Sequence, residues 1–169
     1  VMERRKKKEE EGETKSSKEP KKVSVEDQKL YTETLCIGVK EENLRLIRLL
    51  LAKDETNVNE VDTEGWSPLN LACFHGLVSA VELLLMAEDI DVNQAIITTG
   101  STPLFMACEN GHAPVVELLL ASSGIDVNQA KTTDGCTPLF MACQDGHASV
   151  VKLLLAASDI DVNQARTDD

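Results

Sequence analysis

Three cysteines stand at equal spacing in the sequence and are the first candidates for chemistry. Cys73, Cys108 and Cys143 are 35 residues apart. A disulfide needs Cα atoms within about 7 Å, and two thiolates on one zinc ion, each at about 2.3 Å, must come similarly close. Packed helices lie about 8–10 Å apart, which keeps cysteines on successive helices too distant for either bond. We therefore expect these cysteines to pack in the interior and to hold no metal.

Two histidines repeat at the same interval. His112 and His147 each follow a glycine and are 35 residues apart. Histidine catalysis needs a nucleophile and an orienting carboxylate around the ring. The simpler expectation is that both imidazoles hydrogen-bond loop backbone at the start of a helix. His75 differs because it precedes its glycine at a surface-facing position, and we expect it to serve in binding.

Sequence motifs that carry catalysis are missing from the chain. There is no glycine-rich phosphate loop, no His-Glu-x-x-His, no Cys-x-x-Cys pair and no nucleophile elbow. The periodic residues also have a structural explanation. We therefore expect that the protein is not an enzyme and that it uses no cofactor and no metal.

Composition and charge argue against nucleic-acid-binding, membrane and secreted proteins. The 169 residues have a formal net charge of −12, and residues 65–169 hold only three basic residues against 13 acidic ones. A useful DNA contact set neutralises about 6–10 phosphates, so these residues do not bind nucleic acid. No apolar run approaches the roughly 18–20 residues of a membrane span, and no apolar signal region opens the chain. Five cysteines, an odd number, fit a reducing compartment, so we expect a cytoplasmic protein, with the nucleus as the alternative.

Residues 1–23 are expected to form a disordered tail of mixed charge. Residues 1–29 carry ten Lys or Arg against eight Asp or Glu, and almost no apolar residue occurs between Met2 and Lys22. Such a segment cannot offset an ordering cost of about 1–2 kcal/mol per residue. Order is expected from Ser24, which precedes a carboxylate by three residues as a helix N-cap does. The basic clusters Arg4–Lys8 and Lys15–Lys22 leave two interpretations open, a solvated linker or a nuclear import signal.

A period of 35 residues organises the rest of the chain. Glycine, proline, alanine and an Asp-Val-Asn-Gln segment each recur at this interval, which defines units at residues 65–99, 100–134 and 135–169. A divergent unit at residues 24–64 precedes them, with its helices offset by 34 instead of 35.

Each unit predicts two short helices. Thr102 is an N-cap hydroxyl before Pro103, and Gly111 ends the first helix because glycine accepts a left-handed backbone. The second helix has apolar residues over 115–120, a face too wide for one helix pair to bury. Neighbouring units must cover it, as in a solenoid, and the polar residues 126–135 form a hairpin to the next unit.

The pattern G-x-T-P-L-x-x-A-C-x-x-G-H, followed by V-V-x-L-L-L and D-V-N, resembles the ankyrin repeat over about 140 of the 169 residues. The resemblance implies an all-α repeat solenoid of stacked helix-turn-helix units joined by β-hairpin loops. Asn70, Phe105 and Phe140 replace the family's usual histidine, and the phenyl rings are expected to pack instead. The resemblance also implies that the asparagines of the D-V-N segments hydrogen-bond neighbouring hairpin backbone, and that they are possible substrates of an asparaginyl hydroxylase. These asparagines are Asn59, Asn93, Asn128 and Asn163.

The last unit keeps the apolar residues of an internal repeat, at Val150, Val151 and Leu153–Leu155. A terminal repeat normally has a polar outer face. We therefore expect the sequence to be a fragment of a longer array.

The resemblance implies a protein-binding concave face made by hairpin tips and first helices. Trp66 and Phe74 are the large rings at these positions, and they either anchor a partner or, for Trp66, cover the junction with the divergent unit. We expect a monomeric adaptor or scaffold whose partner protein has a basic or mixed-charge surface. The alternatives are the recognition arm of a larger enzyme or channel, and a spacer that binds nothing. The expected contact residues are Glu64, Trp66, Phe74, His75, Thr99, Ser101, Glu109, Asn110, Asp134, Cys136, Gln144 and Asp145.

Overall fold

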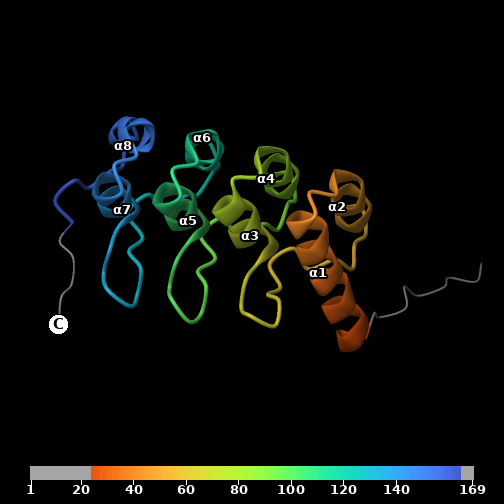
Figure 1. Ribbon diagram of the computed structural model, residues 1–169. Helices are drawn as coiled ribbons and strands as arrows, with labels where there is room; N and C mark the ends of the chain where they lie inside the picture. The colour runs from red at the N-terminus through yellow and green to blue at the C-terminus, as the bar shows by residue number, and fades with distance from the viewer. Residues whose placement is uncertain (1–23, 165–169) are drawn as a thin grey trace, which may run out of the picture.

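The computed structural model describes residues 24–164 as a solenoid of four helix pairs (Figure 1). The expected tail at residues 1–23 lies outside the described residues. The first helices of the pairs form one row, the second helices form another, and long loops extend from the row of first helices (Figure 1). The pairs are α1 (Val25–Lys40) with α2 (Leu44–Leu51), α3 (Pro68–His75) with α4 (Val78–Leu85), α5 (Pro103–Glu109) with α6 (Ala113–Leu120), and α7 (Pro138–Gln144) with α8 (Ala148–Leu155).

The helix boundaries follow the predicted signals. The Thr102 hydroxyl accepts a hydrogen bond from the Phe105 amide at 3.1 Å, and Pro103 opens α5. Thr137 caps α7 in the same way, with the Phe140 amide at 3.1 Å. Gly111 lies just after α5 and has a φ of 72°. This left-handed backbone conformation is unstrained for glycine but strained for a residue with a side chain.

The loops between units turn back on themselves as hairpins but contain no β-strand within residues 24–164. In the loop before α5, the Ile96 amide donates to the Ser101 carbonyl at 3.0 Å, and the Gly100 amide donates to the Ile96 carbonyl at 2.7 Å. These two bonds close a tight turn. The expectation of β-hairpins is therefore wrong in detail, while the all-helical solenoid is confirmed.

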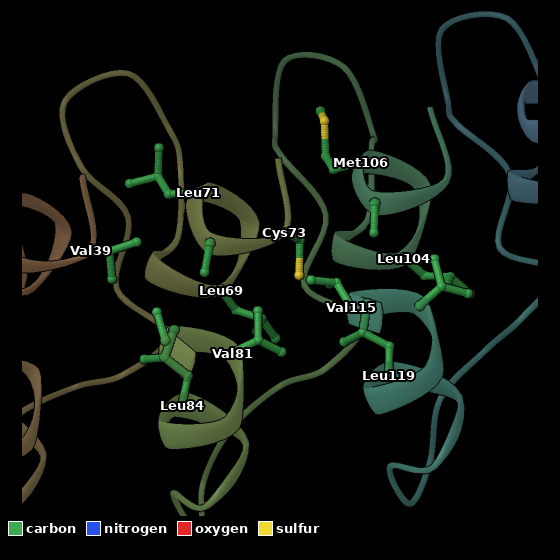
Figure 2. Close-up of a cluster of buried hydrophobic side chains, with 14 of the residues drawn as sticks. Val39, Leu69, Leu71, Cys73, Val81, Leu84, Leu104, Met106, Val115 and Leu119 are labelled. Atoms are coloured by element: carbon green, nitrogen blue, oxygen red, sulfur yellow. The ribbon is translucent and has the colours of Figure 1, made fainter. Parts of the chain in front are cut away.

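The core is continuous from pair to pair (Figure 2). Leu69 and Leu104 of the first helices, and Leu84 and Leu119 of the second helices, are at most 1 % exposed. The second and third pairs therefore contribute the same apolar positions to a shared interior. Figure 2 shows Val81 and Val115 among them, also buried.

The three residues in place of the family's histidine differ in burial. Asn70 and Phe105 are buried, and the Asn70 side-chain amide Nδ2 donates to the Gln94 carbonyl at 3.1 Å. Phe140 is 38 % exposed. The expectation that a phenyl ring packs here is thus confirmed for Phe105 and only partly for Phe140.

The first pair departs from the others. Helix α1 begins at Val25, directly after Ser24 as expected, and runs for 16 residues. Its N-terminal half reaches to the level of the loop tips in Figure 1. Glu42 stands where later pairs have glycine and keeps the left-handed backbone, with a φ of 52°. None of the helices in the described residues is both long enough and apolar enough to cross a membrane.

Candidate protein-binding surface

The predicted contact residues lie on the hairpins and at the C-terminal ends of the first helices, and we call this strip the contact row. Most of them are at least partly accessible. Exposed positions are Glu64, Phe74, His75, Asn110, Gln144 and Asp145. Partly exposed positions are Trp66, Thr99, Glu109 and Asp134.

Ser101 and Cys136 are corrections to this prediction. They are 1 % and 4 % exposed, so neither side chain is available to a partner. Both residues lie directly before the helix N-cap, and at this position a backbone hydrogen bond closes the hairpin. The Ile96 amide donates to the Ser101 carbonyl, and the Lys131 amide donates to the Cys136 carbonyl. A small side chain at this position is covered. Trp66 occupies the same position but is too large to be covered completely.

Three rings that are exposed or partly exposed lie together on the contact row, and we call Trp66, Phe74 and His75 the aromatic cluster. The Trp66 and Phe74 ring centroids are 5.4 Å apart, and those of Phe74 and His75 are 5.0 Å apart, both in edge-on geometry. Trp66 also packs against the core. It thus supports the junction with the first pair and still offers part of its ring to the surface.

The hairpin that carries Trp66 is held by hydrogen bonds and an ion pair. The Asp62 carboxylate accepts hydrogen bonds from the amides of Glu64 and Trp66 at 2.9 and 3.0 Å. Lys40 pairs with the same carboxylate at 3.3 Å. This hairpin therefore holds the indole in place before any partner arrives, which lowers the entropy cost of binding.

The two periodic histidines link neighbouring units. His112 Nε2 lies 3.0 Å from the Phe74 carbonyl, and His147 Nε2 lies 2.9 Å from the Glu109 carbonyl. A carbonyl only accepts, so these bonds require the tautomer with the proton on Nε2. The expected backbone role is confirmed, but the partner is the end of the preceding unit's first helix rather than the start of the histidine's own helix.

The asparagines of the D-V-N segments form a ladder between successive loops. The Asn93 side chain donates to the Gly124 carbonyl at 2.7 Å and accepts from the Asp126 amide at 2.9 Å. Asn128 makes the same two bonds one unit further, to the Asp159 carbonyl and the Asp161 amide. The expected hydrogen bonding to neighbouring loops is confirmed for Asn59, Asn93 and Asn128, although these loops follow the second helices instead of forming the hairpin tips.

The periodic cysteines have no metal-binding geometry. Cys73 and Cys108 are fully buried. Burial raises the pKa of Cys108 to about 12 and raises the pKa of Cys73 well above its ordinary value. Residues 24–164 contain no group of three or more His, Cys, Asp or Glu side chains arranged to hold a metal ion. Cys143 is exposed, so the expectation of interior packing is wrong for this third cysteine.

Thiol labelling of the folded chain at pH 8 is expected to modify Cys143 alone, because the other four cysteines are buried. The raised pKa of Cys36 and Cys108, about 12 each, also keeps those thiols protonated and unreactive. Mass spectrometry should show a single adduct, which the Cys143→Ser variant loses. All five cysteines should react in denaturant. Rapid labelling of a second cysteine in the folded chain would contradict the burial described above.

The stacked helix pairs, with loops and helix ends exposed along one side, define a helical repeat solenoid. A family model described as ankyrin repeats (3 copies) matches residues 17–96 and 91–166. The chain belongs to the ankyrin repeat family. Ankyrin repeats are in general protein–protein interaction modules. A comparison with curated proteins gave no significant match.

Proposed function

We propose that the chain binds another protein through the contact row and acts as the interaction module of an adaptor or scaffold. The observation that carries the proposal is the aromatic cluster. Phe74 is 36 % exposed on a rigid helix end, beside an indole whose backbone is fixed. Exposed aromatic anchors of this kind are enriched among the residues that dominate interface energies.

The variation between units supports the same conclusion. Positions that build the frame, such as the capping hydroxyl, the proline and the glycine after the first helix, repeat from unit to unit. The position of Phe74 is instead occupied by Glu109 in the next unit and by Gln144 in the last. A constant frame with variable exposed ends is the arrangement that a binding scaffold needs.

The charge of the contact row favours a partner with a basic or mixed-charge surface. Lys40 and Lys131 form ion pairs with Asp62 and Asp134, at 3.3 and 3.4 Å. The carboxylates of Glu64, Glu109 and Asp145 form no ion pair with any described residue. We propose that the chain acts as a monomer in the cytoplasm, or in the nucleus if its basic tail is an import signal.

The test is a capture experiment with the 169-residue chain and a Trp66→Ala/Phe74→Ala variant. Each anchor is expected to contribute about 2 kcal/mol, or about 30-fold in Kd, so the double variant should lose its partner. The matched control is Met86→Ala, a large apolar residue that is 78 % exposed but lies after α4, away from the contact row.

Both variants should keep the circular dichroism of the parent. A protein that the parent and the Met86 variant retain, and the double variant loses, supports the proposal. Equal retention by all three chains would remove the contact row as the binding surface.

A further inference from the structure

We propose that the contact row receives an extended basic segment of the partner, with Lys or Arg at every third residue. One of these side chains lies against the aromatic cluster, and the following ones meet Glu109 and Asp145. This inference rests on the proposed function and names the chemistry that the same surface recognises.

Unneutralised charge at the helix ends is the first argument. Helix α5 ends at Glu109, and Asp145 follows the last residue of α7. Neither helix has a basic residue in its last turn. The C-terminal end of a helix carries about half a negative charge, so a carboxylate there is unfavourable and a cation is favourable. A basic partner side chain at each of these helix ends would supply the missing positive charge.

The aromatic cluster is the second argument. Trp and Phe rings attract cations over their faces, with Trp the strongest. Elsewhere in the structure the chain already forms such pairs, with Lys53 4.7 Å from the Tyr31 ring centroid and Lys131 5.5 Å from that of Phe105. No Lys or Arg of residues 24–164 lies over Trp66 or Phe74. A guanidinium from a partner would lie against the accessible part of these two rings.

The spacing follows from the repeat. Helices α3, α5 and α7 pack one against the next, so their ends follow one another along the contact row (Figure 1). Packed helices are about 8–10 Å apart, and an extended chain rises about 3.2–3.4 Å per residue. One step between units therefore corresponds to about three residues of the segment. The motif that fits is Arg-x-x-Arg-x-x-Arg.

Trp66 makes the inference directly measurable, because it is the only tryptophan in the sequence. The probes are two fluorescein-labelled peptides of equal composition, Arg-Ser-Gly-Arg-Ser-Gly-Arg and Arg-Arg-Arg-Ser-Gly-Ser-Gly. Binding to the 169-residue chain is followed by anisotropy, and contact with the ring is followed by Trp66 emission with unlabelled peptide. We expect the spaced peptide to bind at least about fivefold more tightly and to change the emission.

Three variants locate the contacts. Phe74→Ala is expected to weaken the spaced peptide about tenfold, and Glu109→Gln about threefold to fivefold. Glu88→Gln is the matched control, because Glu88 is an exposed carboxylate after α4 and outside the contact row. It should leave the affinity unchanged apart from a small general effect of charge.

The outcomes separate this inference from the proposed function. If both peptides bind equally, and the Glu109 and Glu88 variants lose affinity equally, an acidic protein is attracting basic peptides in general. That result would overturn the proposed spacing of basic residues. If neither peptide binds while the capture experiment still depends on Trp66 and Phe74, the basic segment is wrong and the contact row stands. If both experiments fail, the contact row is not a binding surface.

Discussion

Replacing Phe105 by alanine is expected to lower the free energy of unfolding by about 3–5 kcal/mol, whereas the same change at Phe140 costs much less. Phe105 is fully buried and Phe140 is 38 % exposed. Removal of the Phe105 ring leaves a cavity between two units, in addition to the lost transfer free energy. At Phe140 water already reaches the ring, so both contributions are smaller.

The two positions form a natural pair for this measurement. Each phenylalanine lies in the same six residues, Pro-Leu-Phe-Met-Ala-Cys, and each donates its backbone amide to the N-cap threonine hydroxyl at 3.1 Å. Helix propensity and the unfolded chain are therefore matched, and the difference isolates the cover that a following unit provides. Urea unfolding, followed by circular dichroism, gives both values. Equal losses of stability would show that the two rings share one environment, contrary to the burial described here.

The second large effect is expected at Gly111. A methyl group added there would lie 2.5 Å from His147 Nδ1 and 2.7 Å from Cε1, and the φ of 72° is itself unfavourable for alanine. The backbone conformation costs about 1–2 kcal/mol. Relief of the clash requires the imidazole to move, which breaks its bond to the Glu109 carbonyl and adds about 1–2 kcal/mol more. Gly111→Ala should therefore destabilise the chain by about 2–4 kcal/mol.

Gly146 is the control for this substitution. It has nearly the same φ, 75°, but no atom lies within 4 Å of an added Cβ. Gly146→Ala should show the backbone cost alone, about 1–2 kcal/mol. The difference between the two variants in thermal or urea unfolding then reports the contact between units. If Gly146→Ala proves as costly as Gly111→Ala, the histidine contact contributes nothing to the penalty.

Periodicity made the fold predictable from the sequence. The capping hydroxyl before proline, the glycine after the first helix and the wide apolar face of the second helix each have a local physical reason. The same reasons recur every 35 residues, so a mistake in one unit would have been visible against the others. Helix α5 begins at Pro103 and is followed by Asn110 and the left-handed Gly111, as those signals require.

The contact row was less predictable because exposure depends on neighbours that the repeat pattern does not describe. Ser101 and Trp66 occupy the same position, yet one is buried and the other reaches the surface because of its size. Cys143 has the same phase as the buried Cys108 but is exposed, since no described helix covers that side of α7. The hydrogen-bond partner of His147 could not be predicted from the sequence either, because it is the carbonyl of Glu109, 38 residues away along the chain.

The asparagine ladder has a mechanical consequence. Each asparagine is one rung of this ladder and joins its loop only to the next loop, by two hydrogen bonds to the neighbouring backbone. Helix packing likewise joins each helix pair to its neighbours. A pull on the two ends of the solenoid would therefore load the rungs in series, and the weakest one would open first. Each unit released would add about 115–125 Å of extended chain for its 35 residues. Under tension, the molecule would lengthen in equal steps as an extensible tether instead of failing at once.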